Sequence, residues 1–521
     1  MKRVISLILV ICFMALALVA CGGNKNTGTS GTPGNSNSEE TDVLDKWENV
    51  KFEGDVLNVL ARKDLKVSKE WEQEEGASDD DGLGQIVALR NEVVEGSLGL
   101  EVRVTFMGEE FAQDSKNFMD QVLGAAVRND VDSGSGTYDI VACYGYVALA
   151  ATFRDLWANL LDKQTFPYFD FSQPCWNQSL VKNGTIANQM YICAGDMNLS
   201  MYDSAMVIWY NKDLHGRLED GSPEDIQDTV IAGKWTYDKL FDWAEYYENI
   251  DDKGNKGDIF GISMNGAKFP TEPFDAIPYA WDIDFMTYDE QTQTYDYNFI
   301  GNTKAEEAMN KLRAFFTQEG VATEALGDRP EFWDGGIVFD ADKIWFSKEA
   351  CMSRREMTDR FAILPWPKYD EAQEDYATTS QDYFTTLAVV NHSESATPTK
   401  GEQVSAYLQF STEYSRENVR DVYFKEIVEG RNFGQFADGT TEKSQKIFNE
   451  YIIDKLEYDF STIYCRALND VLNVCWRSNV LIPETNTPAT ATVESAFRNK
   501  LNAYEQALTE LYKSFGVERS N

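Results

Sequence analysis

Residues 204–214 read SAMVIWYNKDL and give the clearest local signal in the chain. Five bulky apolar residues run directly into Asn211, Lys212 and Asp213. A short apolar run that ends in turn-forming residues predicts a buried strand followed by a turn or a helix cap. We therefore expect a core strand here, with Asn211 and Asp213 in the turn and cap and Lys212 exposed to solvent.

Strand and helix patterns alternate upstream of this stretch. Apolar periodicity predicts strands at 55–61, 100–106 and 137–146, and helices at 82–99 and 116–130. Strand and helix alternating at this spacing predict a parallel sheet with crossover helices. The expected core face of the first helix consists of Ile86, Leu89, Val93 and Val94.

A second α/β region begins near residue 195. Thr236 is placed to cap a helix, and Thr303 with Glu306 forms a capping box for a helix over 303–320. The fold class expected from both regions is α/β. Further strands are predicted at 360–366 and 384–390, and helices from about residue 400 onward.

The N-terminus has the pattern of an export signal. Lys2 and Arg3 precede an uncharged apolar run, which ends in small residues before Cys21. The end of the run, Leu18-Val19-Ala20-Cys21, resembles the lipobox of bacterial lipoproteins, in which this cysteine carries the lipid. A signal-anchor helix is the alternative, although the run is short for a membrane span. The following Gly/Ser/Asn/Thr-rich residues are typical of a flexible tether, so we expect a domain that is lipid-anchored on the outer face of the cytoplasmic membrane.

Composition limits the classes of function. The 521 residues carry a formal net charge of −39, which argues against nucleic acids and anionic membrane surfaces as partners. Two histidines are too few for a multi-histidine metal site and make a histidine-based triad a poor candidate. The sequence contains neither a G-x-S-x-G elbow nor a P-loop. We therefore expect no enzyme, no cofactor and no metal.

Two further patterns have alternative readings. Residues 249–261 alternate Asp, Asn and Gly like a calcium loop, but Phe260 stands where a bidentate glutamate is needed, so a solvated turn is favoured. Six cysteines remain beyond the signal and the lipobox, without CxxC spacing. Disulfides and buried free thiols both fit this pattern.

Several stretches, in order, resemble the family 1 extracellular solute-binding proteins, which are the lipoprotein receptors of ATP-binding-cassette sugar importers. The matching segments are ALRNEVVEGSLGLEVRV (88–104), the region from PYFDFSQPCWNQ to YNKDL (167–214), GKWTYDKLFDWA (233–244) and FAILPWPKYDEAQEDYAT (361–378). Cys175 departs from the family pattern, which usually has tryptophan there.

The resemblance implies two α/β lobes, with a hinge between them, that close over a ligand. The expected domains are a signal at 1–20, a tether at 21–49, lobe 1 at 50–193 and 384–435, lobe 2 at 194–383, and C-terminal helices at 436–521 that pack on the hinge or on lobe 2. It also implies a monomeric receptor that binds a mono- or oligosaccharide and delivers it to the permease subunits of an importer. A glycan-degrading lipoprotein and a ligand-sensing receptor subunit are the alternatives.

Candidate ligand contacts follow from the chemistry of a sugar site, which needs aromatic platforms and directional polar groups. In open α/β sheets such groups lie beyond the carboxyl ends of strands. Core packing is the alternative for Tyr144 and Trp281, and a solvated surface or a lobe–lobe salt bridge is the alternative for Arg354. For Asp196 and Asp382 the alternative is a hinge hydrogen bond. The candidates are Trp71, Glu72, Tyr144, Tyr146, Asp196, Asn198, Tyr202, Trp281, Asp282, Arg354, Asp382 and Tyr383.

Overall fold

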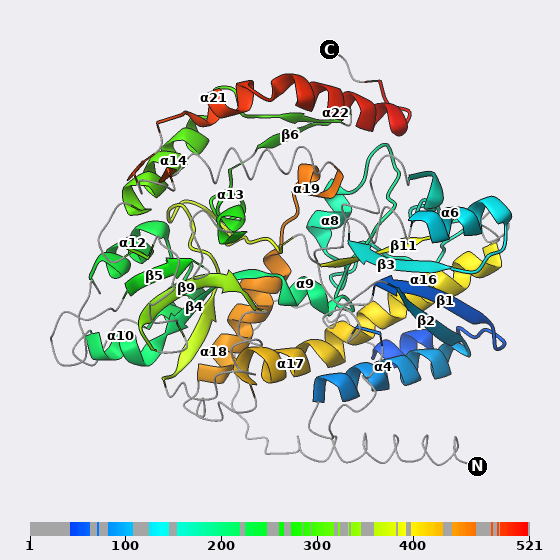
Figure 1. Cartoon of the computed structure of the whole chain (residues 1–521). Coiled ribbons are helices and arrows are strands. Elements are labelled where there is room, and N and C mark those ends of the chain that lie inside the picture. The colour runs from blue at the N-terminus through cyan, green and yellow to red at the C-terminus, as the bar shows by residue number, and fades with distance from the viewer. Residues whose placement is uncertain are drawn as a thin grey trace, which may run out of the picture. The chain divides into compact units, whose positions relative to one another are not determined.

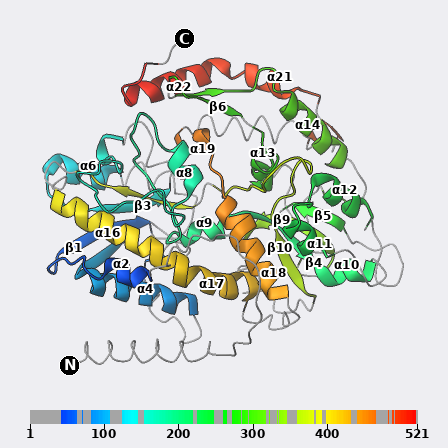
Figure 2. The ribbon, with the colours of Figure 1, turned by 180° about the vertical axis from the view of Figure 1, so that it is seen from behind.

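The chain divides into two units, Met1–Asp45 and Lys46–Asn521, and the architecture below is that of the second unit. Figures 1 and 2 show its helices and strands from opposite sides. The predicted signal, Cys21 and most of the predicted tether lie outside the described residues. The computed structural model describes residues 42–62, 70–71, 82–107, 124–144, 154–218, 225–246, 260–264, 272–283, 285–292, 294–316, 321–322, 332, 335–344, 359–381, 384–391, 398–430, 440–464, 481–482, 487–488 and 490–518.

The first sheet has the strand order β11-β3-β1-β2. β1 (Val56–Arg62) pairs in parallel with β2 (Glu101–Met107) and with β3 (Ile140–Tyr144). β11 (Thr385–Val389) comes from much later in the chain and pairs antiparallel with β3. The three strands predicted from the alternation are therefore present, and their parallel pairing is confirmed.

α4 (Gly82–Leu98) connects β1 to β2, and α6 (Gly124–Ser133) precedes β3. The predicted core face of α4 is confirmed at Val94, which is buried, and wrong at Ile86, Leu89 and Val93, which are only half-buried. The guanidinium of Arg90 lies in the true core face, where it donates hydrogen bonds to Ser415 Oγ and to a backbone carbonyl. A core face predicted from apolar residues alone cannot include an arginine, so the prediction missed Arg90. The buried residues are Leu83, Gly84, Val87, Arg90, Val94 and Leu98.

The second sheet has the strand order β10-β4-β9-β5-β8. β4 runs antiparallel to both of its neighbours, whereas β5 runs parallel to β9 and to β8. Every residue of β4 is buried, which confirms the core strand predicted at 206–210. The strands are β4 (Met206–Asn211), β5 (Phe260–Met264), β8 (Val321–Ala322), β9 (Ile337–Lys343) and β10 (Phe361–Leu364).

The polar triplet after β4 begins α10 (Lys212–Leu218). Asn211 Oδ1 accepts a hydrogen bond from the Leu214 backbone N–H at 2.8 Å, so it caps this helix as expected. Asp213 pairs with the Arg360 guanidinium at 2.8 Å. The prediction that Lys212 is exposed was wrong: the residue is half-buried, because Lys212 Nζ reaches Gln227 Oε1 at 3.1 Å.

Four further helices belong to the second region: α11 (Ile226–Ile231), α12 (Tyr237–Tyr246), α13 (Ala276–Ala280) and α14 (Thr303–Phe316). The cap predicted for α14 is corrected by one residue. Asn302 Oδ1, rather than a threonine side chain, accepts from the Ala305 backbone N–H at 3.0 Å. The Glu306 carboxylate accepts instead from the backbone of Glu494, a contact that local spacing could not reveal.

Helices dominate after residue 398, as predicted. α21 (Val493–Arg498) and α22 (Leu501–Ser514) pack near the hairpin of β6 (Met286–Asp289) and β7 (Thr294–Tyr297), where the rings of Phe299 and Phe497 stack at 4.2 Å. The remaining elements of the described chain are short: α2 (Val43–Trp47), η2 (Arg154–Leu156), α8 (Gln178–Asn183), α9 (Leu199–Asp203), η3 (Glu272–Asp275), β6 (Met286–Asp289), β7 (Thr294–Tyr297), β12 (Leu481–Ile482) and β13 (Thr487–Pro488). The C-terminal helices are α16 (Pro398–Tyr414), η5 (Ser415–Val419), α17 (Arg420–Tyr423), η6 (Phe424–Gly430), α18 (Thr440–Lys446), η7 (Ile447–Ile452), η8 (Ile453–Lys455), α19 (Phe460–Tyr464), α21 (Val493–Arg498) and α22 (Leu501–Ser514).

Three of the six cysteines lie in the described chain, and all three are buried free thiols: Cys143, Cys175 and Cys193. Within the same ranges no group of three or more His, Cys, Asp or Glu side chains could hold a metal ion. None of the helices built from described residues is long and apolar enough to cross a membrane. Most of the loop at 249–261 lies outside the described ranges.

His215 gives the fold a pH dependence. Its ring is 1% exposed, and burial lowers the pKa of the imidazole from 6.5 to about 4. Because the pKa is lower in the folded than in the unfolded state, neutral His215 favours the folded state fully above pH 6.5. The free energy of unfolding then falls by about 3 kcal/mol as the pH falls toward 4. We expect His215→Phe to lose less stability than the wild type between pH 7 and pH 4.5 in urea unfolding. An identical loss in both proteins would contradict this assignment.

Candidate functional site

Two segments connect the sheets and run side by side. The first contains α9 and leads into β4, and the second leads from β10 back to β11 (Figure 1). Cys193 pairs with Leu387 at one end of this double crossing. At the other end, the Met206 backbone N–H donates to the Thr379 carbonyl at 2.9 Å. Two hydrogen-bonded connecting segments of this kind are where one sheet can rotate relative to the other.

The carboxyl ends of the parallel strands of both sheets adjoin this crossing. In the first sheet, Tyr144 ends β3 and pairs with Thr385 at the start of β11. In the second sheet, Lys343 ends β9 and pairs with Met206 at the start of β4. Ligands of open α/β sheets bind beyond the carboxyl ends of strands, so both edges offer ligand-binding positions next to the same crossing.

A buried polar cluster lies at the edge of the first sheet. Glu70 Oε1 accepts from the Ser200 backbone N–H at 2.5 Å, and Ser200 Oγ accepts from the Thr385 backbone N–H at 2.9 Å. Glu70 Oε2, Trp71 Nε1, Asn198 Nδ2 and Thr385 Oγ1 are buried without a hydrogen-bond partner among the described residues. Buried polar atoms normally have partners, which makes this edge a candidate for polar ligand contacts.

Glu70 is the most perturbed carboxyl group of this cluster. Burial raises its pKa from 4.5 to about 8, although hydrogen bonds from Ser200 and the charge of Arg62 oppose the rise. The carboxyl is therefore mostly protonated at neutral pH, when it can donate as well as accept a hydrogen bond. The sequence analysis selected Glu72 rather than Glu70, because both glutamates flank Trp71 and no local feature distinguishes them.

A raised folded-state pKa predicts the opposite pH dependence from His215. The stabilisation linked to Glu70 is fully present below pH 4.5 and is lost as the pH rises through about 8. Glu70→Gln cannot ionise, so between pH 5 and pH 8 it should avoid a loss of about 3 kcal/mol that the wild type suffers. Urea unfolding at both pH values measures the difference, and Glu92→Gln, at an exposed position of α4, is the control. Parallel curves for Glu70→Gln and the wild type would refute this role.

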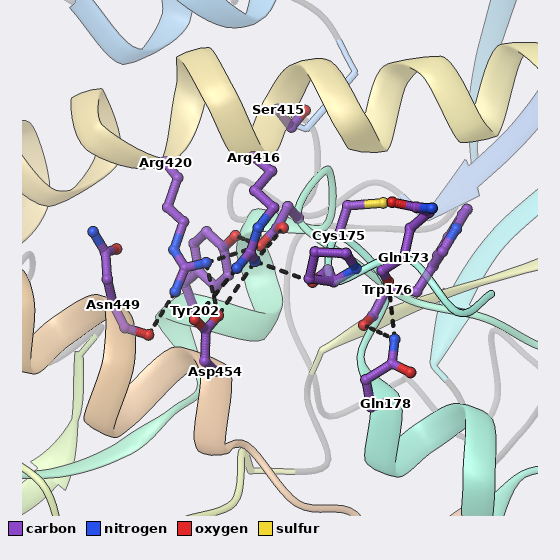
Figure 3. A network of polar contacts seen from close by, with 12 residues as sticks. Gln173, Cys175, Trp176, Gln178, Tyr202, Ser415, Arg416, Arg420, Asn449 and Asp454 are labelled. Carbon is purple, nitrogen blue, oxygen red and sulfur yellow. Dashed lines mark hydrogen bonds and ion pairs between the residues drawn. The ribbon is translucent and has the colours of Figure 1, made fainter. Parts of the chain in front are cut away.

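Asp196, in the first crossing, contacts Tyr202, Arg416 and Arg420 in a charged network. Figure 3 labels these three partners together with Asp454. Asp196 Oδ2 pairs with Arg416 Nη1 at 3.0 Å, and Asp196 Oδ1 accepts a hydrogen bond from the Tyr202 hydroxyl. Asp454 pairs with Arg416 at 3.2 Å and with Arg420 at 2.8 Å. The network thereby joins the crossing to the helical segment that runs through η5 and α17, and to η8.

Burial dominates the electrostatics of this network. It raises the pKa of the Asp196 carboxyl, and the charges of Arg420 and Arg416 oppose that rise. It also raises the pKa of Tyr202 well above 10, with the neighbouring Asp196 charge acting in the same direction. Both groups already have partners within the protein. This arrangement favours the hinge role over direct ligand contact for these two residues.

The other predicted site residues lie in the core, beside a cavity, at the edge of the first sheet or outside the described residues. Trp281 is 1% exposed and packs edge-on against Tyr237 at 4.7 Å, a core environment. Asp282 follows it with a positive φ of 51° and its exposed side chain lines a cavity. Trp71, Asn198 and the backbone of Tyr144 lie at the edge of the first sheet, as described above. The predicted contacts outside the described residues are Glu72, Tyr146, Arg354, Asp382 and Tyr383.

The cavity next to Asp282 has a volume of about 760 Å³ and lies beside α8, α13 and the segment 453–460. Asp196 is the second predicted site residue that lines it. Sequence reasoning did not predict Tyr288, Arg416 or Asp459 as lining residues. The tyrosines of residues 286–297 were the available signal, but α8 and residues 453–460, which also line the cavity, are more than a hundred residues away along the chain.

Comparison with solved structures identifies the fold. The sequence matches no protein-family model and no curated protein. A protein of Listeria monocytogenes, lmo0859, is similar with a TM-score of 0.53 at 10% identity, over 87% of this chain and 99% of that one. The cyclic α-maltosyl-1,6-maltose binding protein of Arthrobacter globiformis is similar with a TM-score of 0.51 at 14% identity, over 88% of this chain and 99% of that one. The fold is thus the two-lobed α/β fold of solute-binding proteins, as the family resemblance implied.

Proposed function

We propose that the protein is a solute receptor that captures a carbohydrate between its two α/β lobes and delivers it to an ATP-binding-cassette importer. The observation that carries this proposal is the position of both strand edges beside one double crossing, in a fold shared with a maltosyl-maltose binding protein. Contacts from both edges would stabilise a closed form. Lipid attachment at Cys21 would hold the receptor at the outer face of the membrane near its permease.

Within this proposal, the ligand contacts come from the edge of the first sheet and the loops beyond it. The residues proposed for these contacts are Trp71, Glu72, Tyr144, Tyr146, Asp382 and Tyr383, of which the structure describes Trp71 and Tyr144. Trp71 and Asn198 each contribute a buried N–H group without a described partner, which suits the hydroxyl oxygens of a sugar. Asp282 and Arg354 are the contributions proposed from the second lobe.

The test is a thermal-shift panel of mono- and oligosaccharides on the mature chain. Binding to the native state alone raises the melting temperature, with a stabilisation of about 2.7 kcal/mol at a hundredfold excess over the dissociation constant. Trp71→Phe, which retains most of the ring but removes the indole N–H, should bind the active sugar more weakly. No shift with any sugar would overturn the carbohydrate assignment, and release of shorter sugars from a bound glycan would favour a hydrolase instead.

A further inference from the structure

A second set of contacts joins the two lobes at a distance from the double crossing. It involves the β6–β7 hairpin and α22. In both views β6 and α22 lie on one side of the unit Lys46–Asn521, whereas α9 and α17 lie on the opposite side (Figures 1 and 2). Because α9 belongs to the first crossing, these contacts form a connection that is remote from the crossing.

The hairpin and α22 belong to the lobe of the second sheet. Trp281, shortly before the hairpin, packs against Tyr237 of α12 at 4.7 Å, and α12 packs against β5. The Tyr512 hydroxyl on α22 accepts a hydrogen bond from the Tyr295 backbone N–H in β7 and donates to the Tyr295 carbonyl at 3.0 Å. The hairpin and α22 are therefore fixed to each other as parts of one lobe.

α8 and the residues that follow it belong to the lobe of the first sheet. Trp176, shortly before α8, donates its indole N–H to Gln409 Oε1 of α16 at 2.9 Å, and α16 packs against α4. Cys193 pairs with Leu387 in β11, the edge strand of the first sheet. The segment 176–193 is thus fixed to that lobe at both of its ends.

Contacts between these two bodies bridge the lobes. The Tyr295 hydroxyl donates to Asn183 Oδ1, at the end of α8, at 2.7 Å. Directly after α22, the Phe515 carbonyl accepts from Gln189 Nε2 at 3.4 Å, and the Phe515 ring lies 5.6 Å from the ring of Tyr191. We call these five residues the latch.

The cavity beside Asp282 lies between the latch and the crossing. Tyr295 and Asn183 of the latch line it, and so do Asp196 and Arg416 of the charged network at the crossing. Its volume of about 760 Å³ falls within the range of small-molecule sites. A ligand in this cavity would therefore contact residues of both lobes, with one connection between the lobes on either side of it.

We propose that the latch holds the two lobes together on the side away from the crossing, so that ligand exchange requires the latch to open. Rotation at the crossing would separate Tyr295 from Asn183 and Phe515 from Tyr191. This inference rests on the hinge motion of the proposed function. It adds that each latch contact favours the closed form over the open form before any ligand binds.

Distance measurement on the ligand-free mature chain tests the latch without any sugar. Nitroxide labels carried on non-natural amino acids at Asp132 of α6 and Asp242 of α12, both exposed, report the separation of the lobes by pulsed electron resonance. We expect one distance population in the wild type. Tyr295→Phe keeps the ring and should raise the ratio of open to closed molecules about fivefold, the usual effect of one hydrogen bond. Tyr295→Phe combined with Tyr191→Ala should raise it at least tenfold, which gives a second population at longer distance.

Matched controls separate the latch from a general loosening of the fold. Tyr297→Phe removes a hydroxyl from the same strand, but that hydroxyl donates to Glu505 of α22 within one lobe. Tyr168→Ala removes a half-buried ring that packs against Trp47 at 5.7 Å. Both controls should retain the wild-type distance, and unchanged circular dichroism spectra establish that all variants are folded.

Three results would overturn the latch. They are a wild-type distribution in the combined variant, an equal shift in the control variants, and a wild type that already populates both distances equally. Absence of a thermal shift with every sugar would leave these distances unaffected, and unchanged distances would leave a sugar-induced shift unaffected. Failure of the latch and failure of the carbohydrate assignment are therefore distinguishable.

Discussion

Alanine at Asp196 is expected to lower the free energy of unfolding by about 3–5 kcal/mol, the usual cost of removing one partner from a buried ion pair. The Asp196 side chain is 4% exposed and the Arg420 side chain 5% exposed. Removing the carboxylate leaves the Tyr202 hydroxyl without the acceptor Asp196, and the guanidinium groups of Arg416 and Arg420 then have one described carboxylate partner, Asp454, between them. Because these charges are shielded from water, solvent cannot replace the lost partner.

Urea unfolding of Asp196→Ala measures this effect, and two controls define its cause. Asp155→Ala removes the surface pair with Arg128, in which the aspartate side chain is 68% exposed, and should cost at most about 1 kcal/mol. Asp196→Asn keeps an acceptor for Tyr202 and should be less harmful than alanine. A cost for Asp196→Ala no larger than that of Asp155→Ala would contradict the structural role of this network.

The same network makes a prediction about ligand binding. Asp196 and Tyr202 belong to the first crossing, so their loss should disturb the hinge and weaken capture of any ligand held by both lobes. Lys212→Ala, at the far end of β4, should leave affinity within about twofold. We expect Asp196→Ala and Tyr202→Phe to weaken binding more than Lys212→Ala in titrations with an active sugar. Equal affinities in all three variants would show that the network does not influence ligand binding through the hinge.

Truncation of Trp209 is the second change with a large expected effect. Its side chain is fully buried in β4, the ring lies edge-on to Phe361 at 5.7 Å, and the indole N–H reaches the Lys343 carbonyl at 3.4 Å. Trp209→Ala leaves a cavity between three strands of the second sheet and should cost about 3–5 kcal/mol. Chemical denaturation with a fluorescence-independent readout, such as circular dichroism, measures this loss.

Two controls accompany Trp209→Ala. Trp209→Phe fills most of the cavity and should cost clearly less than alanine. Ile300→Ala removes a side chain that is 43% exposed and should change stability by no more than about 0.5 kcal/mol. Similar losses for Trp209→Ala and Ile300→Ala would mean that β4 does not carry the core of the second sheet.

Local patterns were sufficient for most elements of the fold. The run before Asn211 has the length and apolarity of a buried strand, and the alternation of residues 55–146 gives parallel strands with helices between them. Local patterns failed where a distant partner decided the outcome. Arg90 is buried because Ser415 and the Glu70 carbonyl accept its hydrogen bonds, and Glu306 contacts Glu494 rather than its own helix start.

The candidate site could be predicted only in part, for the same reason. Polar and aromatic residues after strands indicated Tyr144, which pairs with Thr385 at the sheet edge, and Trp71, whose neighbour Glu70 is hydrogen-bonded to that edge through Ser200. The sequence could not show that Asp196 is already engaged by Arg416, or that Trp281 packs against Tyr237 in the core. Those outcomes depend on segments that lie far apart along the chain.

The sequence by itself determined the α/β class, the order of the two regions and the residue types at strand ends, because periodicity and turn chemistry act over a few residues. Only the tertiary structure decided which charges neutralise one another and which surfaces remain open. The cavity beside Tyr288 illustrates the difference, because α8, the β6–β7 hairpin and residues 453–460 each contribute one wall. Burial and pairing across such distances follow from how the lobes and helices pack, and no local pattern encodes that packing.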